Sequence, residues 1–207
     1  MYATCLLSRF MQSPTQVHYG TAKRVLRYLQ GTKNYGIWYN STSDSRLIGY
    51  TDNNWVGSVD DMRSTSGYTF TLGTRIFSWA SKKQATVAQS SAEAEYIATT
   101  LTTSQVIWLK CIFEDMRVPQ KEATEIYCDS KSAIAMAKNP VFHSRTKHKS
   151  IKYQFIREAE TNHEIKLKHC KTEEQLADIF TKALPRGKFE QLRDYIGVTE
   201  MCIKEES

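Results

Sequence analysis

The chain has 207 residues, of which 41% are hydrophobic and 11% aromatic, enough for one domain with an appendage or two small domains. Its five cysteines are widely spaced without a Cys-x-x-Cys pair, which argues against a disulfide framework and for a reducing compartment. No run of about 18 apolar residues could span a membrane, and the opening residues lack the pattern of a signal peptide. The formal charge of +6 is compatible with an anionic partner such as nucleic acid but does not establish one.

The first forty residues are predicted to form a separate small segment. Ser13 as N-cap, followed by proline, predicts a helix that ends at Gly31. A short strand over residues 35–39 follows, and the polar run 40–45 is typical of a linker. Residues 1–40 are too few to hold a core of their own, so we expect them to dock on something else.

Three strands are expected next. Residues 47–52 read as an apolar strand that delivers a carboxylate, Asp52, at its C-terminal end, although the same residues are compatible with a simple turn. Residues 66–72 and 75–80 alternate on either side of a Gly-Thr turn, which is a hairpin signal. The three strands therefore predict an antiparallel meander. Open α/β sheets bind ligands beyond the carboxyl ends of their strands, where Asp52 would lie.

The next predicted elements each carry an acid. A capping box at Ser90 predicts a long helix with Glu95 in its first turn, where the helix dipole by itself favours a carboxylate. Residues 124–129 form a second apolar strand that ends in Asp129. The helix expected at 133–138 makes this a strand-helix-strand crossover, which builds parallel pairs.

The last third of the chain begins with its most basic patch, residues 143–152. A helix and an alternating edge strand at 164–168 follow. A helix capped by Thr172 then carries Asp178 early in its length, before a final amphipathic helix. The polar tail 199–207 is expected to fray.

Four acids stand out by position: Asp52, Glu95, Asp129 and Asp178. Carboxylates that converge without Cys or imidazole ligands are typical of a magnesium or manganese site. Their mutual repulsion requires cations, and two such ions clamp the attacking and leaving oxygens of a phosphodiester displacement. The chain has 22 acidic residues, so spacing alone does not single out this set.

A series of motifs makes the hypothesis specific. They lie over roughly residues 47–197 and are Gly49-Tyr50-Thr51-Asp52, Arg63-Ser64-Thr65-Ser66-Gly67-Tyr68, Ser78-Trp79-Ala80-Ser81-Lys82-Lys83-Gln84, Ser90-Ser91-Ala92-Glu93-Ala94-Glu95-Tyr96, Tyr127-Cys128-Asp129-Ser130, Arg145-Thr146-Lys147-His148 and Glu174-Gln175-Leu176-Ala177-Asp178-Ile179-Phe180-Thr181-Lys182. With these motifs, which occur in the family's order, the chain resembles the C-terminal ribonuclease H part of the Pol polyprotein of copia-type (Pseudoviridae) LTR retrotransposons, especially plant copies.

The resemblance implies a fold and a division of the chain. The fold is α/β, a ribonuclease H-like mixed five-stranded sheet, an antiparallel meander plus parallel strands, with helices on both faces. Residues 41–198 would form this domain and residues 199–207 a polar tail. Residues 1–40 resemble the stretch that connects reverse transcriptase to the nuclease, so we expect the chain to be part of a larger polyprotein.

The resemblance also implies a site and a reaction. The metal-binding, catalytic acids fall on Asp52, Glu95, Asp129 and Asp178, with Mg²⁺ or Mn²⁺, two ions, as the cofactor and no small-molecule cofactor. Glu95 is preferred over Glu93 because Glu-Tyr-Ile-Ala matches the family pattern. His169 is the candidate auxiliary residue, although a surface or structural role is the commoner case for a lone histidine.

The implied substrate is the RNA strand of an RNA–DNA hybrid, recognised through its 2′-hydroxyl groups and minor-groove shape. The implied partners are this hybrid and the reverse transcriptase portion of the same polyprotein, with no membrane involved. The implied location is intracellular, either cytoplasmic in a virus-like particle or nuclear. Five basic residues are candidates for phosphate contacts, although each taken alone is more simply a solvated surface residue: Lys82, Lys83, Arg145, Lys147 and Lys149.

Three departures from the family leave other functions open. The family commonly has a second Asp at Asn54, a different sequence at Lys149-Ser150, and a Pro near Lys171. None of these changes removes a metal acid, but they favour the alternative of a catalytically inactive remnant that binds nucleic acid or supports a polymerase. A third hypothesis is an unrelated role for a stand-alone fragment, for example as a secreted effector.

Overall fold

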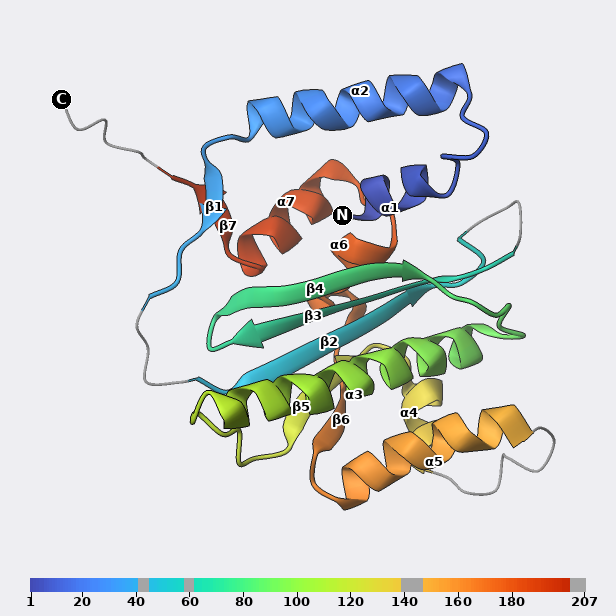
Figure 1. Ribbon diagram of the computed structural model, residues 1–207, viewed down its shortest axis with the longest axis vertical. Helices are drawn as coiled ribbons and strands as arrows, with labels where there is room; N and C mark the ends of the chain where they lie inside the picture. The colour runs from blue at the N-terminus through green and yellow to red at the C-terminus, as the bar shows by residue number, and fades with distance from the viewer. Residues whose placement is uncertain (41–44, 58–61, 139–146, 202–207) are drawn as a thin grey trace.

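The computed structural model describes residues 1–40, 45–57, 62–138 and 147–201, and the side chains of residues 147–153 are outside this description. A five-stranded sheet forms its centre, in the order β4-β3-β2-β5-β6 (Figure 1). The strands are β2 (Leu47–Asn54), β3 (Thr65–Leu72), β4 (Arg75–Lys83), β5 (Thr124–Cys128) and β6 (Ile165–His169).

The predicted mixed sheet is confirmed. β2 pairs antiparallel with β3, and β3 with β4, which gives the predicted meander. β2 pairs parallel with β5, and β5 with β6, through the helical crossovers. As a result, the carboxyl ends of β2, β4, β5 and β6 all lie at one edge of the sheet.

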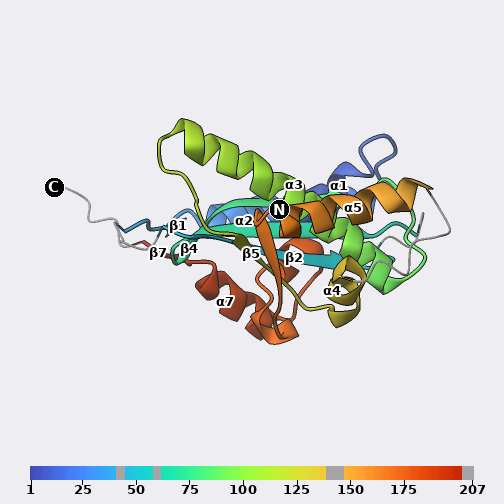
Figure 2. The ribbon, with the colours of Figure 1, turned by 90° about the horizontal axis from the view of Figure 1, so that it is seen from below.

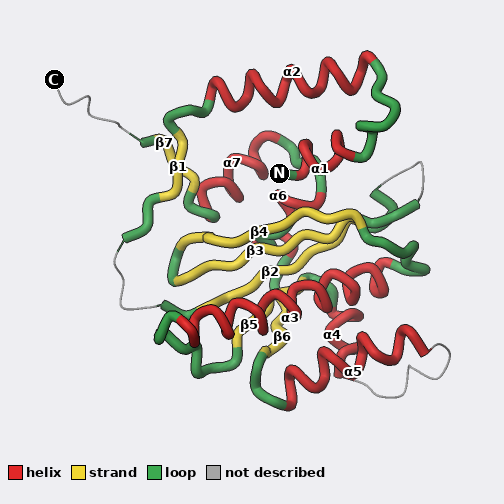
Figure 3. The backbone as a smooth tube through the Cα atoms, in the orientation of Figure 1, coloured by secondary structure: helices red, strands yellow, loops and turns green. Residues whose placement is uncertain are grey.

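Helices cover both faces of the sheet, as predicted (Figures 2 and 3). α3 (Ser91–Asp115) crosses one face and contacts β2, β3 and β5, and α4 (Lys131–Lys138) and α5 (Lys147–Thr161) pack beside it. α6 (Asp178–Thr181) lies on the opposite face against β3 and β2, next to α7 (Arg186–Tyr195).

Two apolar clusters stabilise these layers. The larger one lies between α3 and the sheet and includes Phe70, Val106 and Ile126, all fully buried. The smaller one joins the other face to α7 through Ile76, Phe180 and Leu192. Burial of apolar surface on both faces fixes the strand register, because a one-residue slip would turn each apolar face outwards.

The N-terminal segment folds back onto the C-terminal end of the chain. α1 (Tyr2–Ser8) contacts α6 and β4, and β1 (Tyr35–Ile37) pairs antiparallel with β7 (Val198–Glu200). Between them, α2 (Gln16–Gly31) lies along the outside of the molecule, and it has no buried residue (Figure 1).

Two local predictions were wrong in detail. The N-cap of α2 is Thr15, not Ser13, because Thr15 and His18 satisfy each other's backbone amides. The helix expected from Thr172 is interrupted: Gln175 is extended, because its buried amide group donates to the Thr51 carbonyl and accepts from the Ala177 amide. Asp178 therefore begins a separate helix, α6.

Gly67 allows α6 to approach the sheet closely. A Cβ atom at this position would lie 2.5 Å from Cγ2 of Thr181 and 3.2 Å from Cβ of Phe180. We predict that Gly67→Ala displaces α6 and lowers the free energy of unfolding by about 1–3 kcal/mol, measured by urea denaturation.

The matched control is Gly187→Ala, since a Cβ atom there would meet nothing within 4 Å. This variant should be as stable as the parent chain or more stable by up to about 1 kcal/mol, because Gly is unfavourable in a helix. Equal stability of the two variants would contradict the close approach at Gly67.

Candidate active site

The four predicted acids come from four different elements. Asp52 lies in β2, two residues before the end of that strand, and Asp129 directly follows β5. β2 and β5 are parallel neighbours with Thr51 opposite Cys128, which puts Asp52 and Asp129 side by side. Glu95 is in the first turns of α3, and Asp178 is the first residue of α6.

Asp52 and Asp178 are joined through a lysine. Lys182 places its Nζ atom 2.8 Å from Oδ1 of Asp178 and 3.5 Å from Oδ2 of Asp52. The hydroxyl of Thr181 also donates to Oδ2 of Asp52, and Lys188 lies 2.5 Å from Oδ2 of Asp178. The two carboxylates are 1% and 0% exposed, so these ammonium groups compensate charges that have almost no contact with water.

Glu95 and Asp129 lie on the α3 side of the same edge. A carboxylate oxygen of each is within 4.8 Å of the other and of Sγ of Cys128. Asn53 donates to Oε1 of Glu95 at 3.3 Å, whereas Oε2 is buried without a hydrogen-bond partner in the structure. The presence of Cys128 corrects the sequence-based expectation of a group that contains only carboxylates.

Burial and like charge perturb the acids. Burial, together with the charges of Asp178 and Asp129, raises the pKa of Asp52 from 3.8 to about 7, although Lys182 opposes the shift. Burial, followed by the charges of Asp52 and Asp129, raises the pKa of Glu95 from 4.5 to about 9. Burial alone would lower the pKa of Lys182, but the carboxylates beside it outweigh this effect and raise it.

A divalent metal fits these residues. Carboxylate oxygens are the ligands that Mg²⁺ and Mn²⁺ prefer. Oε2 of Glu95 is a buried acceptor without a hydrogen-bond partner in the structure, and burial together with like charge raises the pKa values of Asp52 and Glu95. Asp52, Glu95, Asp129 and Asp178 are therefore the residues that could hold such ions.

The five basic residues predicted to contact nucleic acid come from the end of β4, from the first turn of α5 and from the segment that precedes α5 in the sequence. Lys82 and Lys83 end β4, at the same edge of the sheet as Asp52. Arg145 is outside the described residues. Lys147 and Lys149 are in the first turn of α5, which begins at this same end of the molecule (Figures 1 and 2), but their side chains are not described.

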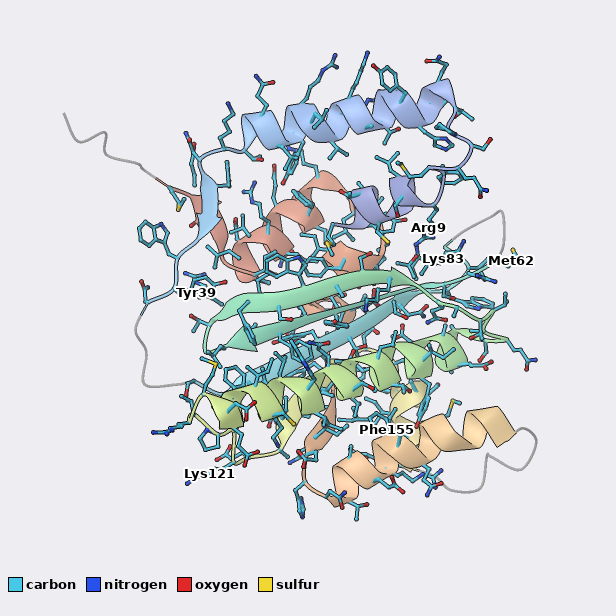
Figure 4. All side chains as sticks on the ribbon, viewed as in Figure 1. Arg9, Tyr39, Met62, Lys83, Lys121 and Phe155 are labelled. Carbon is cyan, nitrogen blue, oxygen red and sulfur yellow. The ribbon has the colours of Figure 1, made fainter. Side chains whose placement is uncertain are left out.

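Arg9 is a further basic residue near Lys83, and sequence reasoning missed it. Its Nη2 atom donates to Thr65 at 2.9 Å, and Thr65 is opposite Lys83 in the sheet. Figure 4 shows Arg9 and Lys83 at the same end of the sheet. Arg9 belongs to the segment that resembles the connection to reverse transcriptase, and nothing in that resemblance indicated that its side chain reaches β3.

Sequence reasoning also missed Lys182 and Lys188. Lys182 is the last residue of a quoted motif and lies four residues after Asp178, a spacing at which acid and lysine meet on a helix. That spacing was a usable signal. Lys188 is ten residues after Asp178 and comes from α7, so only the tertiary structure brings them together.

His169 is the last residue of β6. It is exposed and lines a pocket of about 550 Å³ with Tyr50, Tyr127 and Tyr195. The rings of Tyr50 and Tyr127 stack with centroids 5.2 Å apart. An auxiliary catalytic role for His169 stays a prediction.

The order of the five strands, with antiparallel and parallel pairs and helices on both faces, defines a ribonuclease H-like fold. Among solved structures, LC11-RNase H1 in complex with an RNA/DNA hybrid aligns with a TM-score of 0.49 at 16% identity, covering 66% of this chain and 94% of that one. The strand order, more than this superposition, carries the assignment of the fold.

Sequence relatives identify the family. Pol polyproteins of transposon TNT 1-94 from Nicotiana tabacum and of transposon RE1 from Arabidopsis thaliana are 41% and 42% identical over 95% and 97% of the chain. The chain belongs to the Pol polyproteins of plant retrotransposons and spans 15% and 14% of the length of these two relatives.

Two further comparisons concern a shorter relative and models of protein families. Secreted RxLR effector protein 161 from Plasmopara viticola is 47% identical over 52% of the chain and 75% of its own length. No protein-family model matches the chain. In the described part of the chain, no helix is long and apolar enough to cross a membrane.

The raised pKa values predict how stability depends on pH when chelator removes metal. In the folded protein, Asp52 and Glu95 retain protons that the unfolded chain releases near their ordinary pKa values. Their stabilisation is therefore complete below about pH 4 and is lost as the pH rises through about 7 and then about 9. We expect urea denaturation in EDTA to show falling stability from about pH 5 to about pH 9.

Glu95→Gln should flatten the upper part of this profile, because the amide carries no titrating proton. Glu173→Gln is the matched control, since Glu173 is exposed on the 3-10 turn Thr172–Glu174. Profiles of equal slope for the parent chain and Glu95→Gln would show that Glu95 is not the group responsible.

Proposed function

We propose that this chain is a divalent-metal-dependent endonuclease that hydrolyses the RNA strand of RNA–DNA hybrids during retrotransposon reverse transcription. The observation that carries the proposal is the convergence of four acids, three of them almost completely buried, at one edge of a ribonuclease H-like sheet. Burial raises the pKa values of Asp52 and Glu95, so their ionised forms lower stability at neutral pH, and such a cost is typical of groups kept for function.

Asp52, Glu95, Asp129 and Asp178 would hold two Mg²⁺ or Mn²⁺ ions in this proposal. Such ions, when bound, lower the pKa of a water molecule and stabilise the charge of the leaving oxygen. The four side chains would have to be ionised to bind them. Lys182 provides positive charge to the same carboxylates until then, so metal binding would release it from Asp52 and Asp178.

The basic residues would position the hybrid. Lys82 and Lys83 at the end of β4, with Arg9 beside them, are placed to bind backbone phosphates next to the acids. Lys147 and Lys149 on α5, and Arg145 before it, would extend this contact. Selection of RNA over DNA would depend on the 2′-hydroxyl groups. His169 would assist product release or proton transfer as an auxiliary residue.

The inactive remnant remains a second candidate because of Asn54. This residue is the last of β2, and its side chain faces the backbone of the following turn: a Cβ atom on Gly57 would lie 2.7 Å from its Nδ2 atom. An asparagine that packs on this turn does not take a carboxylate away from Asp52, Glu95, Asp129 or Asp178.

We predict magnesium- or manganese-dependent cleavage of a labelled RNA–DNA hybrid by the purified chain. Asp52→Asn and Asp129→Asn should each lower the cleavage rate by about a hundredfold or more, because each removes a charge that holds the metals. Asn54→Asp is the control, and it should retain cleavage. Cleavage that survives both acid substitutions would refute the assignment, and binding of the hybrid without cleavage would select the inactive remnant.

Residues 1–40 are proposed to attach the nuclease portion, residues 41–198, to the reverse transcriptase portion of the same polyprotein, with residues 199–207 as a tail. Apolar side chains on α2 stay open to solvent: Leu26 is 65% exposed and Leu29 57%. A helix with such a surface is typical of one that packs against a partner. The proposed location is intracellular, in a cytoplasmic virus-like particle or in the nucleus.

Leu26→Glu tests this attachment. We expect it to weaken binding of the chain to the separately expressed polymerase portion by about tenfold or more, measured by titration calorimetry, since a charge cannot be buried unpaired at an interface. Hybrid cleavage by the isolated chain should not change. Lys33→Glu, an exposed charge change just beyond α2, is the control, and equal binding by all three chains would exclude α2 as the contact.

A further inference from the structure

The thiol of Cys128 belongs to the acid group. Its Sγ atom and carboxylate oxygens of Glu95 and Asp129 all lie within 4.8 Å of one another. Cys128 is the last residue of β5 and is fully buried, Glu95 approaches from α3, and Asp129 is partly exposed at the mouth of the group. Three potential ligands of two chemical kinds are thus held by two elements, α3 and the end of β5.

Glu95 gives an independent indication of a ligand at this place. Its side chain is 7% exposed, and Asn53 satisfies only one of its two oxygens. The other, Oε2, is buried without a hydrogen-bond partner in the structure. An unsatisfied carboxylate oxygen costs several kcal/mol in a protein interior unless a cation or donor meets it, so the position favours a bound cation.

The donor set is unusual for a magnesium enzyme. Mg²⁺ prefers oxygen ligands, whereas thiolate sulfur selects softer ions such as Zn²⁺ and Cd²⁺. One thiolate and two carboxylates are three protein ligands, the number that leaves a zinc ion one open position. Ligand atoms around tetrahedral zinc lie about 3.5 Å apart, so the present group must contract by about 1 Å, and the partly exposed Asp129 is the residue best able to move.

We propose that Glu95, Cys128 and Asp129 form a binding site for a thiophilic divalent cation, Zn²⁺ or Cd²⁺, that overlaps the catalytic metal site. On binding, the Cys128 thiol and the Glu95 carboxyl release their protons to solvent, bonds form from the metal to Sγ and to the carboxylate oxygens, and the ion loses bound water. The ion uses two acids that Mg²⁺ also requires, so it excludes Mg²⁺ and arrests the nuclease. The arrest, though not the binding, rests on the proposed nuclease function.

The local hydrogen bonds support a metal-bound thiolate. The backbone amide of Ser130 donates to Sγ of Cys128 at 3.4 Å, and Thr172 donates to Oδ2 of Asp129 at 3.2 Å. Donors to ligand atoms of this kind orient them and stabilise their charged forms. These contacts leave the other lone pairs of sulfur and carboxylate available for an ion.

The test is titration of the metal-free chain with Cd²⁺, which gives an ultraviolet sulfur-to-cadmium charge-transfer band when a thiolate binds. The background chain carries Cys5→Ser, Cys111→Ser and Cys202→Ser, so that Cys128 and Cys170 are its only thiols. We expect one Cd²⁺ per chain with a band that Cys128→Ala removes, together with a loss of affinity of about tenfold or more.

Cys170→Ala is the matched control, because Cys170 is a buried cysteine at the end of the neighbouring strand. It should retain both the band and the affinity. A band that survives in Cys128→Ala, or that disappears only in Cys170→Ala, would overturn the proposal, and so would the absence of a band in the background chain.

A second measurement separates metal binding at Cys128 from the proposed nuclease activity. With each chain's own Mg²⁺-supported cleavage rate as its reference, the concentration of Zn²⁺ that halves cleavage should rise by about tenfold or more in Cys128→Ala. Unchanged Zn²⁺ inhibition in an active Cys128→Ala chain would refute the arrest. If no variant cleaves hybrid but the cadmium band depends on Cys128, the metal site stands and the proposed nuclease function fails.

Discussion

Charge repulsion among buried carboxylates is the constraint on which the site depends. Asp52 and Asp178 are almost completely removed from water, and both contact Lys182. Burial, with the like charges of Asp178 and Asp129 beside it, holds the pKa of Asp52 near 7 although Lys182 opposes the shift. The ammonium groups of Lys182 and Lys188 compensate the buried carboxylates only in part, so the site stays short of positive charge.

The pairing of the strands and the packing of the helices determine how these carboxylates lie relative to one another. Parallel pairing of β2 with β5 sets Asp52 beside Asp129, and the short helix α6 brings Asp178 over Gly67, where no Cβ atom obstructs it. The apolar clusters on the two faces hold α3 and α7 against the sheet, and with them Glu95 and Lys188. The fold thus supplies the energy that keeps mutually repelling groups together.

The sequence predicted those features that depend on local pattern. Strand ends that carry Asp52 and Asp129, and the capping box at Ser90, are short-range signals, and the meander and crossover follow from their order. Spacing alone could not separate Glu93 from Glu95, because the helix dipole favours both. In the structure Glu93 accepts from the backbone amide of Gln89, whereas Glu95 is buried and directed at the acid group.

Features that depend on tertiary contact were beyond the sequence. Gln175 interrupts a helix that its neighbours favour, because its amide group satisfies backbone atoms of β2 that would otherwise be buried without partners. Arg9 and Lys188 reach the site from distant segments. The proximity of Cys128 to Glu95 and Asp129 is likewise visible only in the tertiary structure.

Cys128 changes how the selectivity of the site is understood. Four carboxylates alone would discriminate for hard ions through charge and geometry, but a thiol among them adds a ligand that Mg²⁺ does not use and Zn²⁺ does. Raw affinity generally favours Zn²⁺ over Mg²⁺, so a catalytic magnesium site keeps its metal through the supply of ions in its surroundings. In the proposed nuclease, the acids that would bind Mg²⁺ would therefore also bind, together with Cys128, the metal that stops cleavage.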